Sequence, residues 1–260
     1  MSYYFRNGDI PILILSLHGG HNHLNCSSRK PHPSRPKFVN SNDLHTAEIA
    51  KGIFKQMTDR GYKPFLLVNN IHRKYVDLNR MVTNACSPCC LECKTHYYSF
   101  HSKLSSTVTH ILKTYKKCLI FDVHGNKHSK DMLQLGYHIT LQNLKKQNLS
   151  DNSFYSLKNM NELQLQDHIY KDNSLSCCLQ PSMRRISVSV FPANNTVHDP
   201  PFNGVTSKYY SGTKTVMMNF KDICDVVLVE LSPEVRKKQK APEQIAKGLV
   251  KYYKKIYKDL

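Results

Sequence analysis

The sequence predicts an α/β domain with three layers, in which helices flank a mixed, mainly parallel central sheet. Short apolar runs bounded by turn residues recur along the chain, as buried strands do, and stretches with the apolar spacing of helices lie between them. Strands that alternate with helices are typical of such layered domains. The chain has 260 residues, which suits one large domain, and we expect residues 1–260 to form it.

The strands are predicted from apolar runs. They are Ile10–Leu17, Pro64–Asn69, Cys118–Val123, Ser187–Phe191 and Val226–Leu231. In sheets of this class, ligands bind beyond the carboxyl ends of the strands. We therefore expect the functional side chains at those ends.

Three helices are predicted between and after these strands. The segment Asp43–Arg60 begins with a residue suited to an N-cap and continues with apolar residues at helical spacing. Tyr97–Tyr115 has a similar pattern. The basic C-terminal segment, 237–260, has aliphatic and tyrosine residues at helical spacing, which predicts a terminal helix with a solvated basic face.

The net charge is +18, so a polyanion such as nucleic acid is a candidate partner. The charge is spread along the chain, however, and neither a glycine-rich RNA-binding motif nor zinc-finger spacing is present, so we expect no specific nucleic-acid partner. No run approaches the roughly 20 apolar residues of a membrane span, and the first residues do not resemble a signal peptide. The expected location is the cytoplasm, with no membrane partner. The oligomeric state is left open.

Nine cysteines are present, and an odd number without a signal peptide argues against a disulfide framework. Cys86, Cys89, Cys90 and Cys93 lie within eight positions. Four thiolates could hold a structural zinc ion, but such sites usually separate their two pairs by about a dozen residues. We expect reduced loop cysteines here, with a bound metal as the alternative.

Polar side chains stand at three predicted strand ends. His18 follows the first strand, His124 follows the third, and Glu230 lies near the end of the last. Neutral imidazole is the commonest protein ligand of zinc. A glutamate at the end of an apolar strand is partly desolvated, which raises its pKa toward that of a general base. A single histidine at a strand end is more often structural, but two with a glutamate favour a metal site.

A further polar segment, 72–80, follows the second predicted strand. In it, Asn79 and Arg80 stand side by side and can fork around a carboxylate. Arg73 could polarise a carbonyl group or stabilise an oxyanion. On its own, this segment would be interpreted as an ordinary charged loop.

Taken together, these motifs resemble the N-formylglutamate amidohydrolase family, which belongs with the aspartoacylases to the zinc carboxypeptidase-like superfamily. The motifs are Leu-His-Gly-Gly at 17–20, Asp-Leu-His-Thr at 43–46, His-Arg-Lys-Tyr-Val-Asp-Leu-Asn-Arg at 72–80, Asp-Val-His-Gly at 122–125, Gly-Val-Thr-Ser-Lys-Tyr-Tyr at 204–210 and Val-Glu-Leu-Ser-Pro-Glu-Val-Arg at 229–236. The resemblance covers about residues 10–237, with a divergent insertion at about 140–185. It implies a mixed eight-stranded sheet between helices.

The resemblance also implies roles for single residues. His18 and His124 match the two histidine ligands of one zinc ion per chain. Glu230 matches the catalytic carboxylate, which activates water and protonates the leaving amine, and Arg73 matches the carbonyl-polarising arginine.

For substrate binding, Asn79 and Arg80 match the pair that holds the α-carboxylate of the substrate. Asp77 is expected to support their loop by accepting hydrogen bonds. Tyr209 belongs to the segment that matches the family's glycine- and tyrosine-containing loop, and we expect it to contact the substrate.

The third zinc ligand is not settled by the motifs. Carboxypeptidases use a glutamate three residues after the first histidine, where this chain has His21. Asp43 is an alternative oxygen ligand, and Glu48 is a more remote one. Each has an ordinary interpretation as well, because Asp43 suits a helix N-cap and His21 suits an exposed polar loop.

The expected function is zinc-dependent hydrolysis of a linear amide bond in a small anionic N-acyl amino acid. A carboxypeptidase-like peptide hydrolase is one alternative, since the same Asn-Arg pair suits the C-terminus of a peptide. A catalytically inactive binding protein on the same scaffold is another.

Overall fold

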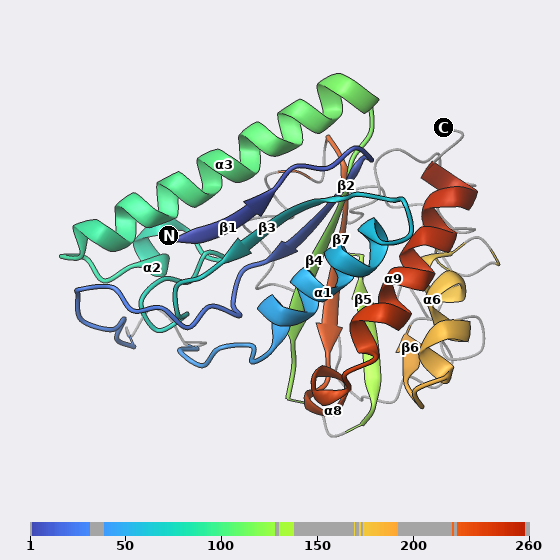
Figure 1. Ribbon diagram of the computed structural model, residues 1–260. Helices are drawn as coiled ribbons and strands as arrows, with labels where there is room; N and C mark the ends of the chain where they lie inside the picture. Colours follow the sequence, from blue (N-terminus) through green and yellow to red (C-terminus); the bar gives the residue numbers. More distant parts are fainter. Residues whose placement is uncertain are drawn as a thin grey trace.

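The computed structural model describes residues 2–31, 39–127, 130–137, 169, 172, 174–191, 220 and 223–257. In this part of the chain, seven strands form one sheet in the order β1-β3-β2-β4-β7-β5-β6 (Figure 1). The strands are β1 (Tyr3–Arg6), β2 (Ile12–Ser16), β3 (Phe65–Asn69), β4 (Leu119–Gly125), β5 (Met132–Gly136), β6 (Ser189–Phe191) and β7 (Asp225–Leu231).

The sheet is mixed and mainly parallel. Strands β3, β2, β4 and β7 are parallel neighbours, β5 and β6 are parallel to each other, and antiparallel pairs join β1 to β3 and β5 to β7. All five predicted strands are present. Strands β1 and β5 were not predicted.

The helices cover both faces of this sheet (Figure 1). They are α1 (Thr46–Thr58), α2 (Val82–Ala85), α3 (Leu91–Tyr115), α6 (Leu175–Arg184), α8 (Pro233–Lys237) and α9 (Ala241–Tyr252), and a π-helical turn follows at Tyr253–Tyr257. The long α3 lies on one face, and α1, α6 and α9 lie on the other. The predicted three-layer α/β architecture is confirmed.

The central strands are apolar throughout because both of their faces are buried. In β2, Ile12 and Ile14 belong to the core under α1 and α9, whereas Leu13 and Leu15 belong to the core under α3. All four side chains are fully buried. The continuous apolar run at this point is therefore a strand that divides two hydrophobic cores.

Two helix boundaries differ from the predicted ones. Helix α3 begins at Leu91, six residues before the predicted start, because Cys90 caps it and its side chain accepts a hydrogen bond from the amide of Cys93. The predicted C-terminal helix at 237–260 corresponds to α9, which begins only at Ala241, and to the π-helical turn that follows it, because α8 ends at Lys237. Lys238 has an extended backbone, and Pro242 lies in the first turn of α9.

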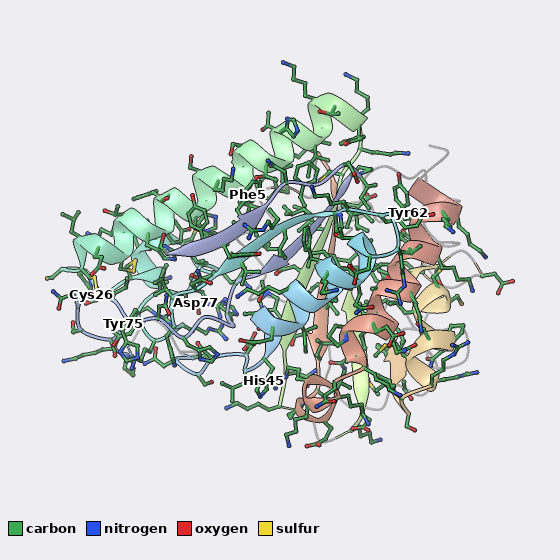
Figure 2. The ribbon with its side chains drawn as sticks, in the orientation of Figure 1. Phe5, Cys26, His45, Tyr62, Tyr75 and Asp77 are labelled. Atoms are coloured by element: carbon green, nitrogen blue, oxygen red, sulfur yellow. A yellow bond between two sulfur atoms is a disulfide. The ribbon has the colours of Figure 1, made fainter. Side chains whose placement is uncertain are left out.

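The expectation of reduced loop cysteines was wrong for Cys86, Cys90 and Cys93, whereas Cys89 is unpaired. Cys26 forms a disulfide with Cys90, and Cys86 forms one with Cys93 (Figure 2). The spacing within 86–93 gave no sign that the loop at Cys26 packs against the start of α3. The two pairs have Cα–Cα separations of 5.9 and 5.7 Å, which suit disulfide bonds.

The predicted insertion at 140–185 lies mostly outside the described residues. Among the helices of the described residues, none has the length and apolar character that crossing a bilayer requires.

Candidate metal centre and active site

The carboxyl ends of β2 and β4 bring two histidines together. His18 lies two residues beyond the end of β2, and His124 is the second-last residue of β4, the parallel neighbour of β2. The loop after His18 packs very closely, since a Cβ atom on Gly19 would lie 2.4 Å from the backbone nitrogen of Ala47. Only glycine fits there, and this close packing fixes the direction in which the chain leaves the strand.

Asp43 reaches the same point from the segment before α1. Its backbone amide donates to the carbonyl oxygen of His18 at 3.1 Å, and its Oδ2 accepts the amide of Gly125 at 3.2 Å. The N-cap of α1 is His45, in the left-handed region with φ 66° and without a side-chain capping bond. The ordinary interpretation of Asp43 as a helix cap is therefore wrong, and its carboxylate instead faces the two histidines.

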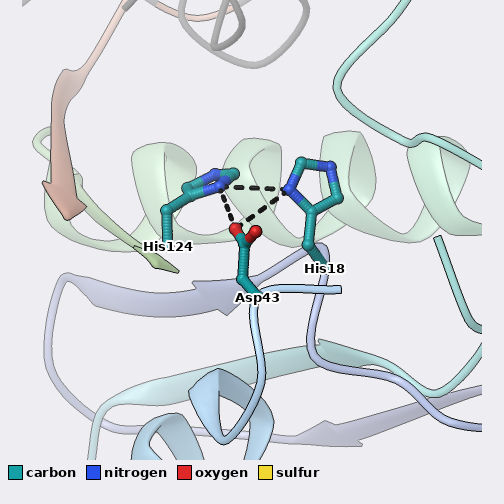
Figure 3. A group of neighbouring side chains, drawn as sticks. All are labelled: His18, Asp43 and His124. Carbon is teal, nitrogen blue, oxygen red and sulfur yellow. Dashed lines mark hydrogen bonds and ion pairs between the residues drawn. The ribbon is translucent and has the colours of Figure 1, made fainter. Parts of the chain in front are cut away.

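Three donor atoms converge in this group (Figure 3). The Nδ1 atoms of His18 and His124 are 3.2 Å apart, and Oδ2 of Asp43 lies 3.3 Å from the first and 3.2 Å from the second. Tetrahedral zinc with ligand bonds of 2.0–2.1 Å separates its ligand atoms by about 3.3 Å. The triangle thus has the dimensions of three ligands around one zinc ion. Among the histidine, cysteine, aspartate and glutamate side chains of the described residues, these three lie close enough together to hold a metal ion.

Carboxylates also lie behind both imidazoles. Nε2 of His18 is 2.9 Å from Oδ1 of Asp77. Nε2 of His124 is 3.1 Å from Oδ2 of Asp122, within ion-pair distance but without the alignment of a hydrogen bond. A carboxylate at Nε2 favours the proton on that nitrogen and leaves Nδ1 free to bind a metal. All of these side chains are buried.

The charges of the group favour a bound cation. Burial opposes the ionisation of Asp43, but hydrogen bonds with His124 and His18 hold its pKa well below the ordinary value. Burial likewise opposes a charge on His124, yet Asp122 and Asp43 raise the pKa of His124 well above its usual range. The carboxylates therefore create a negative potential in a place with little access to water.

Glu230 lies directly beside this group. In the parallel pairing of β4 with β7, Glu230 is opposite His124. Its Oε2 is buried and has no hydrogen-bond partner among the described residues. Burial raises the pKa of Glu230 to about 7. The charge on His124 opposes this shift, and the charge on Asp43 adds to it. A carboxyl group with that pKa can both take up and release a proton near neutral pH.

The structure also brings Arg73 to the group. Its Nη1 lies 3.4 Å from Oδ1 of Asp43, and its Nε donates to Oδ2 of Asp77 at 3.1 Å. As expected, Asp77 accepts hydrogen bonds within its own loop, including one from the amide of Asn79 at 3.1 Å. Burial opposes a charge on Asp77, but Arg73, His18 and Arg29 together keep the pKa of Asp77 well below its usual range.

The predicted carboxylate-binding pair follows Asp77. Asn79 is buried, and its side-chain oxygen has no hydrogen-bond partner in the described part of the chain. The Nη1 of Arg80 donates to the carbonyl oxygen of Asn79 at 3.1 Å, and the hydroxyl of Tyr97 donates to the carbonyl oxygen of Arg80 at 2.9 Å. The pair is thus held between the metal group and α3.

Two predicted candidates, His21 and Glu48, are not part of this group. His21 is exposed, and its Nε2 is 3.9 Å from the exposed Glu48. The chain turns toward solvent after Gly20, so neither residue joins His18 and His124. Tyr209 lies outside the described residues.

Two supporting residues were missed in the sequence. Asp122 precedes His124 by two positions in a strand, and that spacing places both on one face of the sheet, a signal that could have found it. Asn69 is a buried amide at the end of β3. Its Nδ2 donates to the carbonyl oxygens of Leu17 and Ile71, both at 2.8 Å, and its Oδ1 accepts the amide of Ile71 at 2.9 Å. Asn69 thereby fixes the residue that precedes His18.

Comparisons with known proteins agree with this fold. No family model and no curated protein sequence matches the chain. Among solved structures, N-formylglutamate amidohydrolase from Ralstonia eutropha JMP134 is similar with a TM-score of 0.55 and 10% identity, covering 98% of each chain. A gene product from Agrobacterium tumefaciens is similar with a TM-score of 0.55 and 13% identity, covering 98% of this chain and 94% of the other. The fold of this chain is therefore the fold of an N-formylglutamate amidohydrolase.

Proposed function

We propose that this chain is a zinc-dependent amidohydrolase that cleaves the amide bond of a small anionic N-acyl amino acid. The observation that carries the proposal is the triangle of donor atoms from His18, His124 and Asp43, with the buried carboxyl of Glu230 beside it. The fold supports it as well, because a protein of the same fold is named as an N-formylglutamate amidohydrolase.

The metal would be held by Nδ1 of His18, Nδ1 of His124 and Oδ2 of Asp43. Two imidazoles and a carboxylate suit Zn²⁺, and the separations of 3.2–3.3 Å between these atoms fit its size. When bound, the ion would supply a Lewis acid that makes water more acidic and draws charge from a carbonyl oxygen.

Glu230 would act as the proton carrier. Its carboxylate takes a proton from the water that attacks the acyl carbon, and it returns that proton to the nitrogen of the leaving amine. The same carboxyl group must accept the proton in the first transfer and release it in the second, so its pKa should lie near the working pH. Burial places the pKa of Glu230 near 7, which suits both.

Arg73, Asn79 and Arg80 would orient the substrate. The guanidinium of Arg73 stabilises the negative charge that develops on the acyl carbonyl oxygen, while Asn79 and Arg80 donate hydrogen bonds to the substrate carboxylate. The unsatisfied side-chain oxygen of Asn79 can accept an N–H from the substrate. Tyr209 remains a proposed contact of the substrate.

The test is hydrolysis of a panel of N-acyl amino acids by the zinc-loaded protein, with N-formyl-L-glutamate, N-acetyl-L-aspartate and blocked dipeptides included. Release of free amine is measured for the wild type, Glu230→Gln and the control Glu234→Gln. Glu234 is exposed and pairs with Lys237 in α8. We expect Glu230→Gln to keep its zinc and to lose about 10²–10⁴-fold in kcat, the usual contribution of general acid–base catalysis. We expect Glu234→Gln to match the wild type.

Three outcomes would count against the proposal. Zinc-loaded protein that hydrolyses no compound in the panel would leave a binding protein as the better interpretation. Cleavage of the dipeptides alone would identify a carboxypeptidase-like enzyme. Full activity of Glu230→Gln would remove Glu230 from the mechanism.

A further inference from the structure

Arg236, in the last turn of α8, binds the backbone of three separate segments at once. Its Nε donates to the carbonyl oxygen of Leu231 at 3.2 Å, its Nη1 to that of Leu44 at 2.6 Å and its Nη2 to that of Asn126 at 2.8 Å. Every nitrogen of the guanidinium therefore holds a backbone carbonyl, and the three carbonyls belong to segments far apart in the sequence.

Each of these carbonyls adjoins a residue of the candidate site. Leu44 follows Asp43, Leu231 follows Glu230, and Asn126 is two residues after His124. A guanidinium is planar and presents its N–H groups in a fixed fork, so the positions of its three acceptors are tied to one another. Arg236 thus links the backbone next to two proposed metal ligands to the backbone next to the proposed proton carrier.

The surroundings of Arg236 leave it little freedom. A Cβ atom on Gly125 would lie 2.8 Å from both Cζ and Nε of Arg236, so the guanidinium lies directly against the backbone that follows His124. The amide of Asn126 donates to the carbonyl oxygen of Leu231 at 3.0 Å. This bond joins two of the three segments that Arg236 binds. Burial lowers the pKa of Arg236, and the negative charges of Asp43 and Glu230 act against that shift.

We propose that Arg236 is a positioning residue that sets the distance between the metal group and Glu230. This inference rests on the proposed function, because it assigns Arg236 to the same site. It differs from the role of Arg73, since every nitrogen of Arg236 is bound to a backbone carbonyl and none is turned toward a substrate. Arg236 acts through the backbone beside Asp43, His124 and Glu230.

The experiment compares Arg236→Ala and Arg236→Lys with the wild type and with the control Lys237→Ala, whose side chain is exposed on the same helix. Zinc affinity is measured by competition with a chromogenic chelator. The visible spectrum of the cobalt-substituted protein reports the geometry of the metal group without any turnover, and kcat and KM are measured on the best substrate of the panel.

We expect Arg236→Ala to weaken zinc affinity and kcat each by about 10–100-fold, the usual effect of losing an outer-shell partner, with KM changed much less. Its cobalt spectrum should shift. Guanidinium chloride at low concentration should restore part of the affinity, because Arg236 is half-buried and a free guanidinium ion can enter the vacated space. Sodium chloride at the same concentration should not. Lys237→Ala should behave as the wild type throughout.

If Arg236→Ala does not fold, Arg236→Lys carries the test, since it keeps the charge without the planar fork and should still shift the cobalt spectrum and weaken zinc binding. Wild-type zinc affinity and an unchanged cobalt spectrum in the folded variants would overturn the inference. A wild type that binds zinc but hydrolyses nothing would contradict the proposed function, while the affinity and the spectrum would still decide the role of Arg236.

Discussion

At the scale of single residues, position along the sequence identified those residues of the candidate site that lie at strand ends. His18, His124 and Glu230 each end an apolar run, and the rule that parallel strands present their ends at one edge of the sheet brings them together. Asp43 could not be chosen over His21 in the same way. The choice between Asp43 and His21 depends on how the segment before α1 packs against the ends of β2 and β4, and no local sequence pattern predicts that packing.

The two candidate third ligands give a direct comparison. We expect Asp43→Ala to weaken zinc binding by more than about 100-fold, because a ligand is lost and not an outer-shell partner. His21→Ala should bind zinc as the wild type does, since His21 is exposed and faces Glu48. Zinc titration against a chelator measures both, with circular dichroism to confirm folding. Loss of zinc from His21→Ala would reverse the assignment.

At the scale of elements, runs of apolar residues predicted five of the strands and missed two, the edge strand β1 and the interior strand β5. β1 is a half-buried edge strand of aromatic residues and arginine. β5 has Gln134 at its centre and ends at Gly136. Neither strand therefore has the run of aliphatic residues by which the central strands were predicted. The start of α3 was hidden by the cysteines, which were interpreted as a loop.

Helix α3 carries a buried histidine that should make stability depend on pH. Burial, together with the charge of His101, lowers the pKa of His96 from 6.5 to about 4. The unfolded chain takes up this proton below about pH 6.5 and the folded chain does not, so the contribution is complete above that pH and is lost as the pH falls toward 4. Between pH 7 and pH 5 the loss is about 2 kcal/mol.

Urea unfolding at pH 7 and pH 5 measures this contribution. His96→Gln, which can still donate to Oδ1 of Asn69, should lose about 2 kcal/mol less than the wild type over the same interval. His110→Gln changes an exposed residue of the same helix and should keep the wild-type dependence. An equal loss in all three proteins would show that His96 is protonated in the folded state.

At the scale of the whole molecule, the order of the strands was beyond the reach of the sequence. Runs of similar apolar character cannot show which strands are neighbours, and they gave no sign that β7 lies between β4 and β5. The Cys26–Cys90 disulfide was missed for the same reason, since these residues meet only because their loops fold onto one another across a sequence separation of 64.

The Cys26–Cys90 disulfide should contribute strongly to global stability. Closing a loop of this length restricts the unfolded chain by about 4 kcal/mol in the chain-entropy model. Cys26→Ser removes the bond and leaves Cys90 in place as the cap of α3. We expect the free energy of unfolding in urea, without reductant, to fall by about that amount. The exposed, unpaired Cys89 provides the control, because Cys89→Ser should leave it unchanged. Equal stability of Cys26→Ser and the wild type would mean that the bond does not constrain the unfolded chain.

The central place of β7 has a consequence for how the protein is made. The donor atoms at 18, 43 and 124 are all synthesised in the first half of the chain, whereas β7, with Glu230, comes near the end. Until the ribosome has released residues 225–231, the facing edges of β4 and β5 have no strand between them. A growing chain that still lacks these residues therefore holds all three donor atoms of the proposed metal site without Glu230, the proposed proton carrier. It also exposes two open sheet edges, which invite aggregation.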